Sequence, residues 1–191
     1  TALVFGSNVE GVAQEAFHYG AKEVLLADDA SLEDYRSEAY TSLLAKLAGD
    51  QKPDVILFPT TTRGRELAGM SAVDLNSGVL VDVTALEVKD GAVVTTRPVY
   101  AGKLLAKVQC SAKPQLVTLR GRAFAKPAED ASQSGTITKV DALLAEDDIS
   151  VKVADYTTAE SAVSLTDAAV IVSGGRGVSN NPGLEPPADL S

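Results

Sequence analysis

The sequence has 191 residues, a net charge of −9 at pH 7 and a pI near 4.6. This acidic balance argues against a DNA or RNA backbone as partner, because such binding needs clustered lysine and arginine, and against an anionic membrane surface. Hydrophobic residues make up 45% of the chain but aromatic residues only 5%, so we expect an aliphatic core of the kind found in buried parallel strands and their helices.

The first elements alternate between strand and helix. Ala2–Phe5 is the first predicted strand. Val9–Phe17 carries apolar residues at i, i+3, i+4, i+7 and i+8, which is the pattern of one buried helix face, and Gly20 is placed to end this helix. Val24–Ala27 is the next predicted strand.

A second helix is predicted with its apolar positions over Leu32–Leu47. Ser31 is expected to cap its first amides, and the acidic residues that follow suit the positive end of the helix dipole. Gly49 and Pro53 mark its end.

Asp54–Pro59 is then an unbroken apolar strand, as expected where helices cover both faces of a sheet, and Arg63–Leu75 is a third helix. Strands alternating with helices predict a parallel sheet.

The pattern then changes to strands without helices between them. Val79–Val88 and Ala92–Val99 flank an Asp90-Gly91 turn, which predicts a β-hairpin. Leu104–Gln109 and Gln115–Leu119 are further predicted strands. An antiparallel section is therefore expected to follow the parallel one.

The last part of the chain begins with a predicted polar loop, Lys126–Gly135. Ile149–Tyr156 and Ala169–Val172 are predicted strands, and the tail Asn181–Ser191 is rich in proline and has no periodicity.

The strongest candidate site follows the last predicted strand, where Gly174, Gly175, Arg176 and Gly177 come in succession. Glycines let the backbone approach a ligand closely, and free amides at such a turn bind anions. An arginine adds a fixed cation for a phosphate or an electron-rich ring. The alternative is a tight turn with a solvated arginine, and the pattern alone does not decide between the two. A G-x-G-x-x-G fingerprint is absent.

Three weaker candidates also follow strands or helix starts. Thr60–Thr62 lies at the carboxyl end of a strand, where ligands of α/β sheets bind, although helix capping explains it more simply. Asn8–Gly11 is best explained as a cap and turn. Arg120-Gly121-Arg122 is the densest basic spot, and it is either a solvated pair or a contact with another subunit or domain.

Catalytic and metal-binding patterns are missing from the sequence. His18, the only histidine, lies near a helix end, and Cys110, the only cysteine, is expected to be a small buried hydrophobe. No residue set has metal-ligand spacing or suits a Ser-His-Asp triad, so we predict neither metal ligands nor catalytic residues. A transmembrane run and a signal peptide are not visible, so we expect the bacterial cytoplasm or, in a eukaryote, the mitochondrial matrix.

Several segments, taken in order, resemble the electron-transfer flavoprotein alpha subunits. The sequence VIVSGGRG at Val170–Gly177 looks like the segment that opens the FAD domain of this family. The other similar segments are PDVILFP, GVLVDVT, RPVYAG and VTLRGRAF, at Pro53–Pro59, Gly78–Thr84, Arg97–Gly102 and Val117–Phe124.

This resemblance implies an electron carrier rather than an enzyme. Family members form a heterodimer with a beta subunit and hold FAD. They pass electrons from primary dehydrogenases, such as the acyl-CoA dehydrogenases of fatty acid β-oxidation, to a membrane quinone oxidoreductase or, in some anaerobes, serve electron bifurcation. Arg176 matches the family's flavin-contacting arginine, and we expect Gly174, Gly175 and Gly177 to contact FAD beside it.

The resemblance also implies the domain organisation. Residues 1–165 are expected to form a Rossmann-like α/β domain for subunit interaction, with a parallel sheet, helices on both faces and an antiparallel extension. Residues 166–191 are expected to begin a second α/β domain that binds FAD. The family has an extra first strand and helix and a longer FAD domain, so most of the FAD site is expected beyond this chain. An adenine-nucleotide-binding α/β module and an interaction scaffold remain as alternatives.

Overall fold

The computed structural model describes residues 1–157, 165, 168 and 170–173. The chain divides by its contacts into residues 1–153 and 154–191, and every described helix and strand belongs to the first unit. The predicted domain boundary at residue 165 stays a prediction, because most residues beyond it lie outside the described ones.

A first parallel sheet is formed by β1 (Ala2–Gly6), β2 (Glu23–Asp28) and β9 (Thr136–Lys139), with β2 in the middle. Helix α1 (Glu10–His18) connects β1 to β2, and Gly20 follows it with a φ of +95°. The strand β9 was not predicted, because its sequence Thr-Ile-Thr-Lys is short and has a single large apolar residue.

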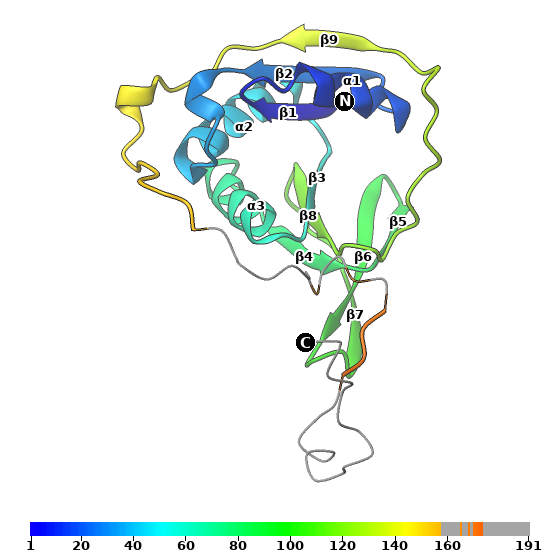
Figure 1. The fold of residues 1–191 in the computed structure, drawn as a ribbon. Coiled ribbons are helices and arrows are strands. Elements are labelled where there is room, and N and C mark those ends of the chain that lie inside the picture. Colours follow the sequence, from blue (N-terminus) through cyan, green and yellow to red (C-terminus); the bar gives the residue numbers. More distant parts are fainter. Residues whose placement is uncertain (158–164, 166–167, 169, 174–191) are drawn as a thin grey trace, which may run out of the picture. The chain divides into compact units, whose positions relative to one another are not determined.

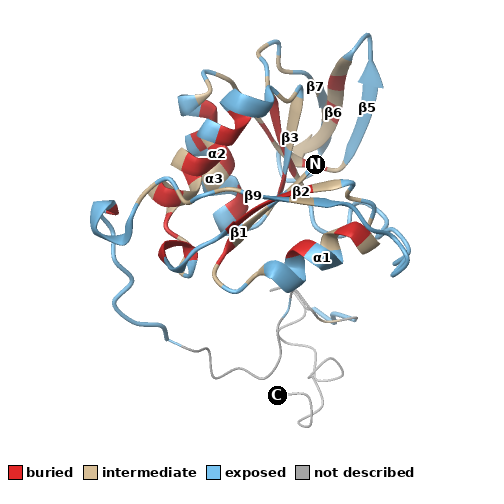
Figure 2. Ribbon diagram, turned by 90° about the horizontal axis from the view of Figure 1, so that it is seen from above, coloured by how far each residue is buried: buried red, intermediate tan, exposed pale blue. Residues whose placement is uncertain are grey.

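Strand β2 is covered by helices on both of its faces (Figures 1 and 2). Val24 and Leu26 pack with Phe17 of α1, whereas Leu25 and Ala27 pack in a separate cluster on the other face, toward α2. All four strand residues are at most 1% exposed. The unbroken apolar run is thus explained by burial on two sides.

The second predicted helix is interrupted, so its predicted start was wrong. A 3₁₀ turn, η1 (Ala30–Leu32), comes first, and the α-helix α2 spans Ser37–Gln51. Asp29, not Ser31, caps the 3₁₀ turn by accepting a hydrogen bond from the Ser31 amide. The apolar spacing predicted the buried face correctly, because Leu32 and α2 residues both pack on β2.

A second parallel sheet has the order β3 (Val55–Pro59), β8 (Gln115–Leu119) and β4 (Val79–Val83). Helix α3 (Thr62–Asp74) packs on one face of it, as the residues of their common cluster show. The prediction of β8 as part of an antiparallel section was wrong, since it is the central strand of this parallel sheet. Likewise, the predicted run Val79–Val88 is two strands in different sheets.

The antiparallel sheet consists of β5 (Ala85–Lys89), β6 (Ala92–Val99) and β7 (Leu104–Val108). The predicted hairpin between β5 and β6 is confirmed. Asp90 and Gly91 form its two-residue turn with φ values of +52° and +76°, and positive φ at both positions matches the right-handed twist of the strands.

Residue Gln115 fastens the antiparallel sheet to the second parallel sheet. Its side chain is 2% exposed and exchanges two hydrogen bonds with the backbone of Val93, accepting at 2.8 Å and donating at 3.0 Å. It also donates to the Cys110 carbonyl oxygen at 3.1 Å. A backbone hydrogen bond of 2.9 Å from Thr84 to Thr96 adds a second link.

The predicted strands after residue 145 are not formed. A 3₁₀ turn, η2 (Glu146–Asp148), precedes Ile149, which is 1% exposed and packs in the cluster of β2 and α2. Residues 149–156 form no strand, and two of them contact α2 as single anchors: Ile149 packs against its apolar face, and the Ser150 amide donates to Glu38 at 3.0 Å. Residues 170–173 form no strand either, and Val172 is 93% exposed.

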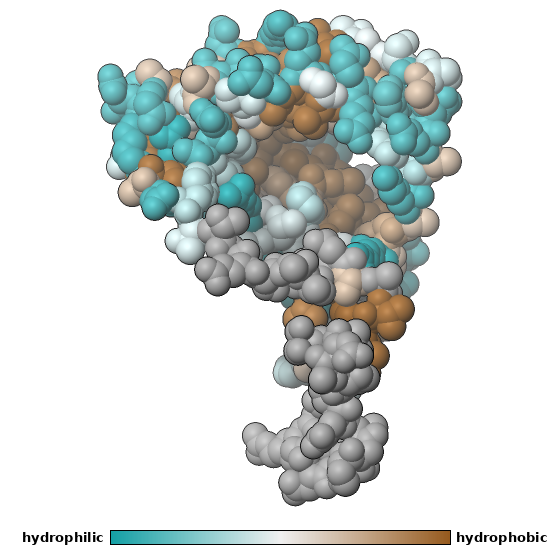
Figure 3. All heavy atoms as spheres, viewed as in Figure 1, coloured by the Kyte–Doolittle hydropathy of each residue, from teal (hydrophilic) through white to brown (hydrophobic). Residues whose placement is uncertain are grey.

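The predicted α/β class is confirmed for the first unit: helices flank parallel sheets, and antiparallel strands extend them. The predicted start of a second α/β domain stays a prediction. Hydrophilic residues dominate the upper part of the face in Figure 3, and apolar side chains gather in its hollowed middle.

The outer strands β1 and β3 each carry an exposed leucine, Leu3 at 38% and Leu57 at 54%. Among the described residues, no helix is long and apolar enough to cross a membrane.

Candidate functional site

The predicted glycine–arginine site is not placed by the structure. Gly174, Gly175, Arg176 and Gly177 all lie outside the described residues. Their role in binding FAD therefore stays a prediction.

The described residues gather a different set of polar groups at the carboxyl end of the sheet β3-β8-β4. The backbone amide of Thr60 donates to the Leu119 carbonyl at 2.8 Å, and that of Arg120 donates to the Val83 carbonyl at 2.9 Å. These two hydrogen bonds join the carboxyl end of β8 to the carboxyl ends of β3 and β4. Ligands of open α/β sheets commonly bind at this edge.

A hydroxyl group lies at the centre of this edge. Thr118 is fully buried, and its Oγ1 accepts hydrogen bonds of 2.9 Å from the Thr60 hydroxyl and from the Asp82 amide. Thr61 accepts from the Gly64 amide at 3.0 Å and so caps helix α3. The capping explanation of Thr60–Thr62 is thereby confirmed for Thr61.

Residue Asp82 carries the acidic group of this edge. It interrupts the pairing of β4 with β8 and has a φ of +62°, which is unusual for a residue other than glycine. Its carboxylate accepts from Arg120 Nε at 2.9 Å and from the terminal guanidinium nitrogen at 2.5 Å. The hydrogen bond from Arg120 lowers the pKa of Asp82, and the charges of Arg65 and Arg97 lower it further.

Arginines are concentrated at this end of the sheet. The sequence has seven arginines, and five of them, Arg63, Arg65, Arg97, Arg120 and Arg122, come from the start of α3, the end of β6 and the segment after β8. We call these five residues the basic edge. The predicted basic spot Arg120-Gly121-Arg122 is thus one part of a larger group that three separate segments build.

The first-strand loop is occupied by a carboxylate. Asp28 accepts from the amides of Asn8 and Val9 at 2.6 and 3.2 Å. These are the amides that a phosphate would need, so the loop is a turn closed by Asp28. The turn predicted at Asn8–Gly11 is confirmed, but the predicted cap is not formed, because the N-cap residue of α1 is Val9, whose side chain makes no capping hydrogen bond.

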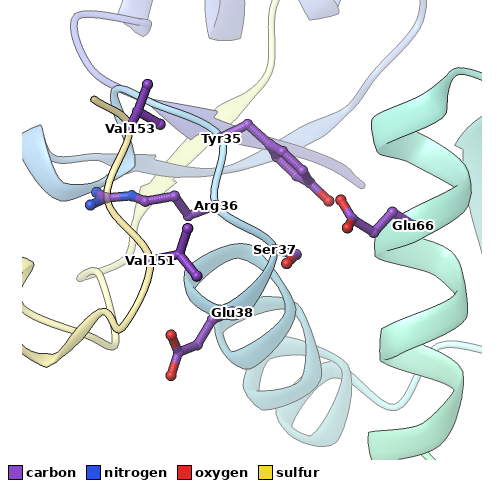
Figure 4. A pocket seen from close by; sticks show the side chains of 7 residues that line it. All are labelled: Tyr35, Arg36, Ser37, Glu38, Glu66, Val151 and Val153. Atoms are coloured by element: carbon purple, nitrogen blue, oxygen red, sulfur yellow. The ribbon is translucent and has the colours of Figure 1, made fainter. Parts of the chain in front are cut away.

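A small pocket of about 220 Å³ lies beside the start of α2 (Figure 4). The Tyr35 side chain points toward Glu66 of α3, while Val151 and Val153 close the opposite side. Burial and then the neighbouring Glu66 carboxylate raise the pKa of Tyr35 to about 12, so this phenol stays protonated and donates to the Arg63 carbonyl. The pocket is smaller than the ~300–1,000 Å³ of typical small-molecule sites, and it does not fit a flavin dinucleotide.

An ion pair between Arg36 and Glu146 lies beside this pocket, because Arg36 is one of the residues that line it. The Arg36 side chain is 5% exposed and binds both carboxylate oxygens of Glu146 at 2.7 Å, and it also donates to the Ser31 carbonyl. The hydrogen bonds from Arg36 and then Lys152 lower the pKa of Glu146 to about 2. Arg36 and Glu146 are 110 positions apart, and no local pattern in the sequence predicts this contact.

The two remaining candidates from the sequence, His18 and Cys110, each contact neighbouring residues of the fold. His18 ends α1 and lies 3.5 Å from Glu129. Cys110 is partly buried and packs against the cluster of Leu80, Val83 and Val117. No group of three or more metal-ligating side chains occurs in the part of the chain that the structure describes. Sequence reasoning missed Asp82, whose signal was an acidic residue inside an apolar strand.

Comparison with known proteins places this fold in a family. Residues 1–145 match the electron transfer flavoprotein domain. The chain is 37% identical over 189 residues to Protein FixB of Clostridium saccharobutylicum, covering 97% of this chain and 56% of that protein. It is 33% identical over 189 residues to electron transfer flavoprotein subunit alpha of Bacillus subtilis, covering 99% of this chain and 58% of that protein.

The subunit alpha of Thermoanaerobacterium thermosaccharolyticum is 35% identical over 186 residues, with 96% of this chain and 56% of that protein covered. The chain thus spans somewhat more than half the length of these curated relatives. The family match covers nearly all the described helices and strands. The chain belongs to the electron transfer flavoprotein family, and the relatives that it matches are alpha subunits and FixB proteins.

Proposed function

We propose that this protein is the alpha subunit of an electron-transferring flavoprotein and is not itself an enzyme. The observation that carries this proposal is the family match over residues 1–145, together with relatives at 33–37% identity that bear this name or the name FixB.

The cofactor that we propose is FAD, which when bound accepts electrons and passes them on. The pocket beside α2 does not fit this group. The contacts that we propose come from the sequence motif and are Arg176 with Gly174, Gly175 and Gly177. A guanidinium stays protonated and would stabilise negative charge on a reduced flavin ring. Glycines on either side would let the backbone approach the cofactor closely.

The partners that we propose are a beta subunit, a primary dehydrogenase such as an acyl-CoA dehydrogenase of fatty acid β-oxidation, and a quinone oxidoreductase or another acceptor. The name subunit alpha of the relatives supports a heterodimer. We propose the bacterial cytoplasm, or the mitochondrial matrix of a eukaryote, as its location.

The alternative of a free adenine-nucleotide-binding module is not favoured by the site. Asp28 occupies the amides of the first-strand loop, and Thr61 is used as a helix cap. Three of the amides that could hold a phosphate in these two loops, those of Asn8, Val9 and Gly64, are therefore already bound by side chains of the protein.

The site proposal is tested by the substitution Arg176→Ala in the heterodimer, with FAD affinity and midpoint potential as readouts. One charge-assisted contact contributes about 1.5–3 kcal/mol, so affinity should fall about tenfold or more and the potential should shift negative. Arg176→Lys keeps the charge and should retain the potential better than Arg176→Ala. Unchanged affinity and potential in Arg176→Ala would assign this residue to the solvated surface.

A further inference from the structure

We infer that the basic edge, together with the adjoining tip of the β6–β7 hairpin, is a docking surface for an acidic region of the second subunit. The inference rests on the proposed heterodimer for the identity of the partner. Its support comes from the charge, the exposure and the arrangement of described residues.

Charge is segregated at this edge. The whole chain carries a net charge of −9, yet five of its seven arginines come from the three segments around the carboxyl end of the sheet β3-β8-β4. Asp82 binds Arg120 with two hydrogen bonds, whereas no carboxylate of the described chain lies within ion-pair distance of Arg65 or Arg97. A positive surface on an acidic protein attracts a negative one and steers its approach.

The arginines come from rigid elements. Arg65 lies in the second turn of α3, where its amide donates to the Thr61 carbonyl, and Arg120 follows β8 directly. Arg97 is one residue beyond Thr96, whose carbonyl accepts from Thr84 at the end of β4. Backbone hydrogen bonds therefore fix the edge before any partner arrives, which lowers the entropic cost of binding.

Apolar groups continue the surface along the hairpin, whose β6 and β7 strands extend past the end of β4 in Figure 1. Tyr100 is 78% exposed, Leu104 58% and Leu105 70%. Arg97 and Val99 are two positions apart and so lie on the same face of β6, and Leu104 pairs with Val99 across the hairpin. Exposed tyrosine and arginine beside apolar side chains are the composition of protein–protein hot spots.

This composition favours a protein over a free phosphate. Phosphate sites need converging donors around one point, whereas these arginines spread over three segments and border three exposed apolar side chains. Apolar groups gain free energy only against an apolar partner surface. The occupant is therefore a region of the partner subunit that presents carboxylates beside apolar residues.

The test measures the dissociation constant of this protein and the separately purified beta subunit at low and high salt. Arg65→Glu should weaken binding about fivefold or more at low salt, and the effect should shrink toward twofold at ~0.5 M salt, where exposed charges are screened. Lys46→Glu makes the same change of charge on α2, near the amino end of β3, and should leave binding within twofold. Tyr100→Asn removes the exposed aromatic ring, and asparagine tolerates the positive φ of +52° at this position. This substitution should weaken binding about tenfold at both salt concentrations, because it changes no charge.

The outcomes separate this inference from the proposed function. If the two proteins bind but Arg65→Glu and Tyr100→Asn match Lys46→Glu, the docking surface is wrong while the heterodimer stands. If they do not associate at all, the proposed function fails and the docking surface with it. If millimolar inorganic phosphate blocks binding more than chloride of equal ionic strength does, the edge is an anion site, which also overturns the inference. Circular dichroism of each variant checks that the fold is retained.

Discussion

The side chain of Gln115 gives the sharpest prediction about the fold, because it links two sheets through two buried hydrogen bonds and makes a third that is partly buried. Gln115→Leu keeps a side chain of similar size but leaves the Val93 amide, the Val93 carbonyl and the Cys110 carbonyl without these partners. Each stranded buried group costs about 1–3 kcal/mol, with carbonyls at the low end because each has a second lone pair. We subtract about 1 kcal/mol for the apolar surface that leucine buries.

The expected loss is therefore about 2–4 kcal/mol in the free energy of unfolding, measured by urea denaturation with an unchanged m-value. In a thermal scan this corresponds to a Tm about 5–15 °C lower. Gln109→Leu is the matched control, since Gln109 is exposed and should change stability by less than about 0.5 kcal/mol. If Gln115→Leu were as stable as this control, the hydrogen bonds would not be what joins the two sheets.

Two further substitutions test other parts of the fold. Glu146→Gln removes the charge that Arg36 binds. The pKa of Glu146 in the folded protein, about 2, lies below its ordinary value of 4.5. The contribution of this carboxylate to the free energy of unfolding is therefore complete above pH 4.5 and is lost as pH falls toward 2. The urea midpoints of wild type and variant should therefore differ at pH 7, approach each other as pH falls below 4.5 and converge only at about pH 2. A constant difference would contradict the ion pair. Gly64→Ala would place a Cβ 2.1 Å from the Pro59 carbonyl oxygen and should lower the Tm by several degrees. Gly69→Ala in the same helix has open space and should raise the Tm instead; equal shifts of both would refute the steric argument.

The sequence predicted the elements of the first half because their signals are local. Apolar spacing marked the buried residues Ala13 and Phe17 of α1, although Val12 of the same predicted face is exposed, and the Asp90-Gly91 pair marked the hairpin turn. It did not predict that β8 is inserted between β3 and β4, because pairing between distant strands leaves no local pattern. Ile149 was wrongly assigned to a strand. A buried strand and a single anchor residue on α2 both need an apolar side chain, so the residue type alone does not distinguish them.

The candidate site was predicted less well than the fold. The sequence singled out Arg120 and Arg122, but only the fold shows that Arg65 and Arg97 reach the same end of the sheet. The bidentate pair of Asp82 and Arg120 likewise depends on the register of β4 against β8. Arg176 was predicted from a local motif, and its role is decided by the flavin measurements above and not by the described residues.

The central claim is that this protein is one subunit of an electron-transferring flavoprotein. The most direct measurement is the absorption spectrum of the protein co-expressed and co-purified with its beta subunit. We predict a one-to-one complex with bound FAD, whose flavin absorption bleaches under a chemical reductant and returns when an electron acceptor is added. A complex without flavin, or a flavin that cannot be reduced and reoxidised in this way, would contradict the claim.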